Sequence, residues 1–293
     1  MTTRDLDGRT VLVVGASGTQ GGAVARSLAQ AGAIVRGASK RGAHTRAGLP
    51  VKLDLMSHAA IATEILRGVD AAFLHVPLSF GAPGDTAKVL PLVDELGKSV
   101  RRVVFSASGP LPDSPVGAPF VDERLALARA VLATGKGVVL QTTGFLENFS
   151  AAWSAPSVVA GELVYPFAPS ALGRWVTNRD VGAAVVGALS REEAVGRIFM
   201  VAGPELLSMS DVAARIGDGI GRAVQFRRIE GREYGQCLAP FLGQDLGAMI
   251  GGFYDAMPNG NPSFAADGAG AARALGYAQT TVLHWARTET WCP

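Results

Sequence analysis

Regularly spaced glycines near the start of the chain are the first feature that suggests chemistry. The segment Gly15-Ala-Ser-Gly-Thr-Gln-Gly21 follows an apolar run, Val11 to Val14, and precedes a stretch with helical periodicity. Glycines at such a junction allow a tight turn and let the backbone approach a pyrophosphate, which the N–H groups and the positive dipole end of the next helix attract. The loop predicts a dinucleotide site. Its predicted contacts are Gly15, Ser17, Gly18, Thr19, Gln20 and Gly21.

The end of the second apolar run bears on which nicotinamide cofactor would bind. An acidic residue there would hold the adenosine ribose, whereas a cation would accept a 2′-phosphate. The sequence from Val35 to Arg41 contains no acid and ends in Ser39, Lys40 and Arg41. We therefore predict NADP(H), with these three residues at the phosphate. The alternative is a solvated basic turn. Asp54 follows the third run, where it would accept the adenine amino group or cap a helix.

These residues require elements that bring them to one edge of a sheet. Apolar runs alternate with helical periodicity as far as residue 144, which predicts parallel strands joined by right-handed helical crossovers. The predicted fold class is α/β, a doubly wound, Rossmann-like parallel sheet. This context favours a dinucleotide site over a purely structural glycine turn. The six strands are predicted at residues 11–14, 33–35, 51–55, 71–76, 101–108 and 137–144, and the later helices at residues 59–68, 87–99 and 124–135.

The strand and helix rhythm ends near the middle of the chain. Residues 145–175 read as loops and short segments, residues 179–190 as a helix that returns to the sheet, and residues 201–293 as helices and turns. We predict an NADP(H)-binding domain over residues 1–145. A smaller, mostly helical substrate lobe is predicted over residues 146–293.

Composition limits the class of partner. The 293 residues are 48% hydrophobic and 18% charged, with a net charge of +2, which is typical of a globular chain without a basic field for nucleic acid. Cys237 and Cys292 are too far apart in sequence to suggest a disulfide framework or a metal site. Neither a signal sequence nor an apolar run of about 18 residues is present, so no membrane association is predicted. We expect a soluble, cytoplasmic protein with a small-molecule partner, and its oligomeric state stays open.

The glycine loop, together with the blocks "GRWVTNRDVGAAVVGAL" and "VAGPELLSMSDVAARIGDGIGR", resembles the NmrA-like branch of the short-chain dehydrogenase/reductase superfamily. The resemblance implies that Lys40 meets the 2′-phosphate and that Asp54 contacts adenine. Members include quinone reductases, ketoreductases and redox-sensing regulators that bind NADPH without turning it over. Further cofactor contacts expected on this basis are Leu55, His75, Val76, Pro77 and Phe145.

Proton donation is the unresolved part of the predicted chemistry. Active short-chain reductases use a tyrosine and, four residues later, a lysine; this chain has Phe120 and Arg124 at that spacing. Phenylalanine cannot donate a proton, and arginine is a poor acid, although it can bond a ribose hydroxyl. A lost general acid forfeits a factor of about 10² to 10⁴, less than orientation against NADPH can deliver. The remaining donors are water, a side chain such as a catalytic His75, and the substrate's own phenol. Ser108 is the second predicted catalytic residue, because it could hydrogen-bond the carbonyl.

The segment from Cys237 to Gly260 mixes glycines with methionine and aromatic residues. It predicts either a broad pocket for a flat ligand or an ordinary helix pair. The predicted function is an NADPH-dependent ketoreductase for a bulky aromatic polyketide of the angucyclinone type, in antibiotic biosynthesis. The alternatives are a non-catalytic NADPH/NADP-sensing regulator and a quinone reductase. Predicted substrate contacts are Phe120, Asn148, Phe149, Phe253 and Met257.

Overall fold

The computed structural model describes most of the chain as two compact units. The described residues are 6–42, 47–55, 63–257, 260 and 262–291. Unit 1 is drawn from Met1–Thr142, Asn178–Val201 and Ala269–Ala278. Unit 2 is drawn from Thr143–Thr177, Ala202–Gly268 and Gln279–Pro293.

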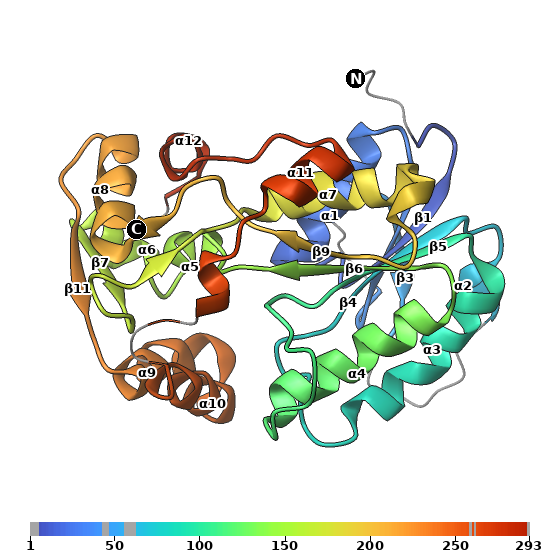
Figure 1. The fold of residues 1–293 in the computed structure, drawn as a ribbon, viewed down its shortest axis with the longest axis horizontal. Helices are drawn as coiled ribbons and strands as arrows, with labels where there is room; N and C mark the ends of the chain where they lie inside the picture. Colours follow the sequence, from blue (N-terminus) through green and yellow to red (C-terminus); the bar gives the residue numbers. More distant parts are fainter. Residues whose placement is uncertain (1–5, 43–46, 56–62, 258–259, 261, 292–293) are drawn as a thin grey trace. The chain divides into compact units, whose positions relative to one another are not determined.

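Unit 1 is built on a seven-stranded parallel sheet with the order β3-β2-β1-β4-β5-β6-β9 (Figure 1). The chain order reverses between β1 and β4, which is the switch point where ligands bind in open α/β sheets. The predicted doubly wound, Rossmann-like fold is therefore confirmed. The strands are β1 (Thr10–Val14), β2 (Ile34–Ser39), β3 (Leu49–Lys52), β4 (Ala71–His75), β5 (Arg102–Ser106), β6 (Gly137–Thr142) and β9 (Ile198–Val201).

Helices cover both faces of this sheet, α1 and α7 on one face and α3 and α4 on the other (Figure 1). The central strands are buried on both faces, which is why they appear in the sequence as continuous apolar runs rather than alternating patterns. The helices of unit 1 are α1 (Thr19–Gln30), α2 (Thr63–Leu66), α3 (Asp85–Ser99), α4 (Pro119–Ala133), α7 (Asn178–Ser190), η1 (Glu192–Ala194) and α11 (Ala269–Leu275).

Some elements differ from the prediction. The sequence predicts six strands, whereas β9 pairs with β6 as a seventh strand of the sheet. Two further strands, β10 (Leu207–Ser208) and β11 (Gln225–Arg228), lie in a region predicted as helices and turns. Both are short, and the sequence of β11, Gln-Phe-Arg-Arg, has only one apolar residue, so neither carries a strand pattern. The helix predicted over residues 59–68 lies partly outside the described residues, which contain its second half as α2.

Unit 2 combines helices with two small sheets. Strand β7 (Glu162–Tyr165) pairs in parallel with β11, and β8 (Leu172–Gly173) pairs antiparallel with β10. No described helix is long and apolar enough to span a membrane. The helices are α5 (Glu147–Ser150), α6 (Ala155–Val159), α8 (Met209–Ile220), α9 (Gly231–Leu242), α10 (Gln244–Asp255), η2 (Pro262–Ala265) and α12 (Val282–Thr288).

The helix pair α9 and α10 packs backbone against backbone. A Cβ on Gly235 would lie 2.5 Å from the carbonyl oxygen of Gly247, and a Cβ on Gly231 would lie 2.3 Å from that of Gly251. Glycines four residues apart on each helix therefore form the contact. The structure thus confirms a helix pair in the segment for which the sequence leaves a pocket or a helix pair open.

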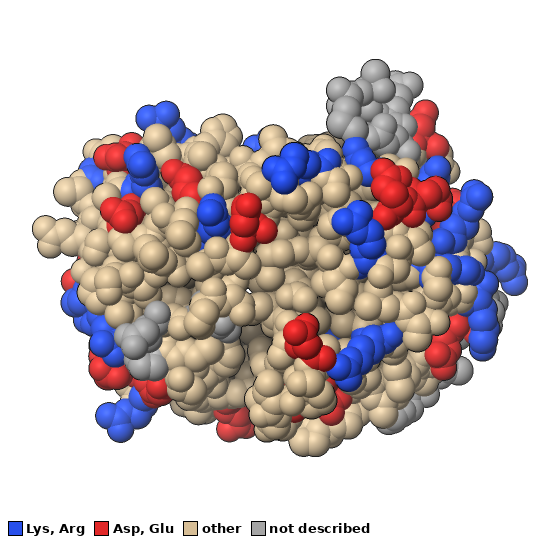
Figure 2. All heavy atoms as spheres, in the orientation of Figure 1, with Lys and Arg blue, Asp and Glu red and all other residues tan. Residues whose placement is uncertain are grey.

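Acidic and basic side chains are interspersed on the face of the molecule drawn in Figure 2. This distribution agrees with the small net charge of +2. Mixed charge of this kind produces no strong field of one sign over that face.

Candidate functional site

The glycine loop of unit 1 is anchored between β1 and β2. The N–H groups of Gly15 and Ala16 both donate to the carbonyl oxygen of Ala38, at 2.9 and 3.1 Å, and Gly15 has a φ of +79°. Helix α1 begins directly after Gly18, its N-cap residue, which provides no side chain for capping. The N–H groups of the first turn therefore remain available to an anion, as a phosphate site requires.

The loop and α1 form a cradle that only glycine fits. A Cβ on Gly21 would lie 2.2 Å from the carbonyl oxygen of Gly15, and a Cβ on Gly15 would lie 3.0 Å from Cδ2 of His75. Ser17, Gly18 and Thr19 are exposed at the rim of this turn. The predicted pyrophosphate residues are thus brought together with the close backbone approach that a dinucleotide needs.

Three strands end in buried polar atoms that have no hydrogen-bond partner among the residues that the structure describes. They are Oγ of Ser39 on β2, Nδ1 of His75 on β4 and Oγ1 of Thr142 on β6. Buried polar atoms are nearly always paired, so such atoms at the carboxyl edge of the sheet indicate a polar ligand. The cradle and these atoms fit a dinucleotide. Thr142 is not among the residues predicted from the sequence.

Two of the residues predicted to contact the adenosine end of the cofactor lie side by side. The ammonium group of Lys40 lies 3.3 Å from a carboxylate oxygen of Asp54, and the Lys40 side chain is 79% exposed. Arg41 is exposed and Leu55 is half-buried. An exposed ion pair of this kind contributes little to stability, so Lys40 stays available to a 2′-phosphate.

His75 ends β4 at the switch point, and its Cα is paired with that of Ser106 on β5. Burial, and then the positive charge of Arg124, lowers the pKa of His75 from 6.5 to about 4. The ring is therefore neutral at neutral pH and does not supply an imidazolium proton. One ring nitrogen of a neutral imidazole donates and the other accepts, which suits a ribose hydroxyl. The next residue, Val76, is buried, and Pro77 is exposed.

The depressed pKa of His75 has a measurable consequence for stability. Because the folded-state pKa is about 4 and the unfolded value is 6.5, the unfolded chain binds more protons between these two pH values. The free energy of unfolding should therefore fall as the pH decreases through this window. A His75→Gln variant lacks this proton uptake, so its free energy of unfolding should fall less than that of the wild type in urea titrations across the window. Parallel pH profiles for the two proteins would contradict the assignment.

Ser108 lies on the loop after β5 in a strained conformation. Its φ of 55° is in the left-handed region, and among the described residues no other non-glycine has a positive φ. Such a backbone costs on the order of 1 kcal/mol and is frequent at functional sites. The Ser108 hydroxyl donates to Oε1 of Gln20, at 3.4 Å, and Gln20 is 6% exposed. Two predicted residues thus meet, and a Ser108 hydroxyl that donates to Gln20 presents lone pairs to a ligand.

Phe120 and Arg124 lie one turn apart on α4. The Arg124 side chain is buried and donates to three backbone carbonyl oxygens: that of Phe120, at 2.8 Å, that of Phe80, and that of Pro77, at 3.5 Å. Its guanidinium also lies 3.7 Å from the centroid of the half-buried Phe120 ring. The Arg124 guanidinium, which the sequence suggests as a partner for a ribose hydroxyl, is therefore already hydrogen-bonded to backbone carbonyls.

The residues of unit 2 that are predicted to bind cofactor or substrate differ in their burial and contacts. Phe145 forms an isolated parallel bridge with Val176. Phe253 and Met257 are half-buried, and a hydrogen bond from Asn148 reaches the Tyr165 hydroxyl. The fully buried ring of Phe149 packs 4.6 Å from the ring of Trp175 and 5.3 Å from that of Tyr165, between centroids. Phe149 is thus a core residue, and its contact with substrate stays a prediction.

Three tyrosines form the centre of this core. The rings of Tyr165, Tyr234 and Tyr254 lie 5.1 to 5.4 Å apart, and the hydroxyls of Tyr165 and Tyr254 share a hydrogen bond. Burial raises the pKa of Tyr254 to about 12. This cluster therefore holds unit 2 together and is a poor source of protons at neutral pH.

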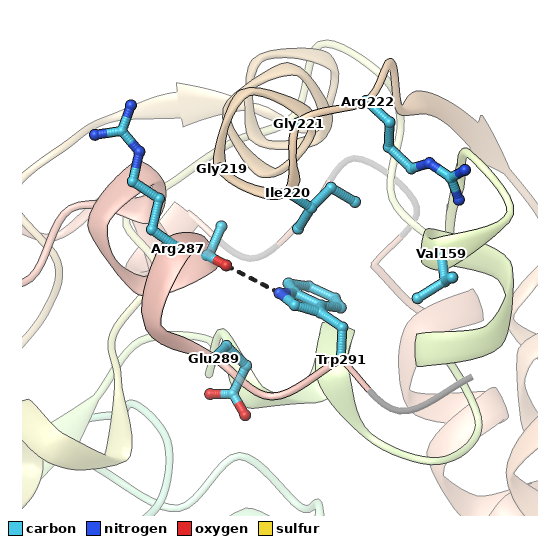
Figure 3. Close-up of a pocket in the computed structure, with 9 residues that line it drawn as sticks. Val159, Gly219, Ile220, Gly221, Arg222, Arg287, Glu289 and Trp291 are labelled. Atoms are coloured by element: carbon cyan, nitrogen blue, oxygen red, sulfur yellow. Dashed lines mark hydrogen bonds between the residues drawn. The ribbon is translucent and has the colours of Figure 1, made fainter.

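A cavity of about 520 Å³ also lies in unit 2 (Figure 3). Arg222 and Arg287 flank it, and the indole nitrogen of Trp291 donates to the carbonyl oxygen of Ala286, at 2.9 Å. None of the residues predicted to bind cofactor or substrate is among its lining residues. Both arginines are exposed, and all of the lining residues belong to unit 2.

The reversal of strand order at β1 and β4, with a glycine cradle at that point, defines the class of Rossmann-fold nucleotide-binding proteins. Residues 7–260 match the model of the NmrA-like family. The chain belongs to this family, as the sequence blocks predict.

Similar proteins include enzymes and a regulator. The NAD(P)H azoreductase of Xenophilus azovorans is 29% identical over 222 residues, which is 74% of this chain and 76% of that protein. The structure of triphenylmethane reductase of Citrobacter sp. with NADP(H) has a TM-score of 0.74 and 16% identity, over 94% of this chain and 99% of that one. The structure of NmrA, a negative transcriptional regulator, with NADP has a TM-score of 0.72 and 18% identity, over 96% and 95%. At these identities the solved structures show a shared fold.

Proposed function

We propose that the protein is an NADP(H)-dependent oxidoreductase that reduces a flat, conjugated aromatic molecule. The glycine cradle carries this proposal, because its packing leaves no room for a side chain at Gly21 and it opens onto the uncapped end of α1. Lys40 and Arg41 directly follow β2, which carries no acidic residue, and this supports NADP(H) over NAD(H). The dye reductases among the similar proteins support an aromatic acceptor.

The residues of unit 1 divide the work of binding. Backbone N–H groups of the glycine loop bind the pyrophosphate, and Ser39, Lys40 and Arg41 bind the 2′-phosphate. The bound cofactor supplies a hydride. His75 stays neutral and orients the nicotinamide ribose by hydrogen bonding, while Ser108 accepts a hydrogen bond beside it. An angucyclinone-type ketone remains the finer substrate prediction from the sequence.

Turnover with a panel of acceptors tests the proposal. The purified protein is titrated with NADPH and NADH by calorimetry, and then mixed with NADPH and an azo dye, a triphenylmethane dye, a naphthoquinone or a polycyclic aromatic ketone. We expect tighter binding of NADPH than of NADH, and oxidation of NADPH with at least one acceptor. Tight NADPH binding without turnover of any acceptor would overturn the enzymatic proposal.

That outcome would favour the second candidate, a regulator that senses NADPH and NADP. The observation behind it is that Phe120 and Arg124 stand where active short-chain reductases have the acidic tyrosine and its lysine. Arg124 donates to backbone carbonyls, and His75 is neutral, so neither supplies the proton. A sensor needs to distinguish the two redox forms of the cofactor, so calorimetry with NADPH and NADP should then give clearly different affinities.

The variant Phe120→Tyr tests the source of the proton. If the substrate's phenol donates it, a tyrosine adds no needed acid, and we expect kcat to change less than about threefold against the 10² to 10⁴ of a positioned general acid. NADPH oxidation is measured with two forms of the best acceptor in the panel. One form carries a phenol beside its reducible group, and the other lacks that phenol. A rate increase of a hundredfold would show that a donor had been limiting and would overturn the substrate-derived proton.

A further inference from the structure

Arg124 is a buried cation whose hydrogen bonds all go to the backbone. Its side chain is on α4 and is 5% exposed. It connects the helix, through the carbonyl oxygen of Phe120, to the loop after β4, through those of Phe80 and Pro77. The planar guanidinium with several N–H donors can join carbonyls from two elements, whereas the point charge of a lysine cannot reproduce this geometry.

The loop is packed closely enough for this connection to fix its position. Gly81 has a φ of +140°, and a Cβ there would lie 2.7 Å from Cα of Phe120 and 3.2 Å from a terminal nitrogen of Arg124. The rings of Phe120 and Phe80 lie 3.7 and 5.6 Å from the guanidinium carbon. The cation is thus enclosed by two rings and by the loop backbone.

Acidic groups fix the far end of the same loop. A carboxylate oxygen of Asp85 accepts from the N–H groups of Gly81 and Ala82, both at 2.9 Å, and the other accepts from Lys88, at 2.7 Å. Glu123, next to Arg124 on α4, accepts from the N–H group of Gly84, at 2.7 Å. One end of the loop is therefore held by a cation and the other by anions.

We propose that Arg124 is a positioning residue that clamps the loop Pro77–Gly81 onto α4 and thereby fixes the chain that follows His75. This inference rests on the proposed function, because the loop matters to catalysis only if the nicotinamide end of the cofactor lies beside His75. The clamp takes the place of the ribose contact expected of a lysine at this position. The positive charge of Arg124 has a second effect, since it helps to keep His75 neutral.

Two substitutions separate the clamp from the charge. Arg124→Lys keeps the charge but loses the planar set of donors, and Arg124→Met removes both. Arg129→Met is the matched control, since Arg129 is on the same helix and donates to the carbonyl oxygen of Asp113, at 2.7 Å, outside the loop. Hydrogen exchange of the Phe80, Gly81 and Ala82 amides is measured in the full chain without cofactor, because all three amides are hydrogen-bonded.

We expect these amides to exchange at least about tenfold faster in both Arg124 variants and at the wild-type rate in Arg129→Met. By NMR, the pKa of His75 should rise from about 4 in Arg124→Met and stay near it in Arg124→Lys. Wild-type exchange in both variants would overturn the clamp. If Arg124→Met does not fold, Arg124→Lys still decides, because wild-type exchange in that variant alone contradicts the proposal.

Kinetics distinguish a clamp from direct cofactor binding. With a displaced loop, Arg124→Lys should lower kcat about tenfold and leave the Kd for NADPH within about threefold, since the groups proposed to bind the pyrophosphate and the 2′-phosphate lie outside the loop Pro77–Gly81. If Arg124 binds the ribose directly, lysine should restore the usual contact and kcat should not fall, which would overturn the proposal. Failure of the wild type to bind NADPH would refute the proposed function, whereas the exchange experiment would still test the clamp.

Discussion

Replacement of Gly21 by alanine should weaken NADPH binding by about a hundredfold or more. The new Cβ would lie 2.2 Å from the carbonyl oxygen of Gly15 and 2.5 Å from its carbonyl carbon, so the loop must move away from α1. This movement separates the N–H groups that bind the pyrophosphate. Two charge-assisted hydrogen bonds lost at about 1.5 kcal/mol each correspond to roughly a hundredfold in Kd.

The measurement is calorimetric titration with NADPH, with circular dichroism as the test of folding. Gly270→Ala in α11 is the matched control, because a Cβ on Gly270 meets no atom within 4 Å. That substitution should leave the Kd unchanged and raise the free energy of unfolding by about 0.5 to 1 kcal/mol. A folded Gly21→Ala protein with the wild-type Kd would show that the cradle does not hold the cofactor.

The strands that the sequence predicts well are those buried on both faces. Strands β1, β4, β5 and β6 each contain at least three consecutive buried apolar residues, so each shows an apolar run in the sequence. Strand β9 has only four residues, and its first, Ile198, is 50% exposed. Its identity as a strand depends on pairing with β6, which comes about sixty positions earlier in the chain and leaves no local pattern.

The same distinction applies to the site. The glycine loop is contiguous in sequence, and its spacing and its place between strand and helix predict its structure. The meeting of Lys40 with Asp54 depends on where two different strands end, and the left-handed Ser108 depends on the path of a loop. Neither the composition nor the residue spacing of the sequence predicts this contact or this backbone conformation. The neutrality of His75 likewise follows from burial in the folded chain.

Phe120 and Arg124 are best understood as one structural pair. The sequence shows two separate departures from the tyrosine and lysine of active short-chain reductases. In the structure the phenyl ring lies 3.7 Å from the guanidinium, and the same guanidinium bonds the Phe120 carbonyl oxygen. A tyrosine hydroxyl adds nothing to this stacking, and a lysine has no planar face to stack. The two changes therefore support each other.

Removal of the Arg102 side chain should destabilise unit 1 by about 3 kcal/mol. Arg102 begins β5 and is 5% exposed; it donates to the carbonyl oxygens of Ala188 in α7, at 2.9 Å, and of Arg191, which directly follows α7. It also lies 2.7 Å from the carboxylate of Glu192. Arg102→Met leaves the two carbonyls without this donor, at about 1 to 3 kcal/mol for each buried group.

All four tryptophans belong to unit 2, so unfolding of unit 1 is followed by circular dichroism and by hydrogen exchange in β5 and α7 rather than by tryptophan fluorescence. The matched control is Arg101→Met, one residue earlier and exposed, which should change stability by less than about 0.5 kcal/mol. Because Arg102 lies at the amino end of β5 and the glycine cradle at the carboxyl edge of the sheet, the folded Arg102→Met protein should keep the wild-type Kd for NADPH. Equal stability of the Arg101 and Arg102 variants would mean that water hydrogen-bonds the carbonyl oxygens of Ala188 and Arg191 when the Arg102 side chain is absent.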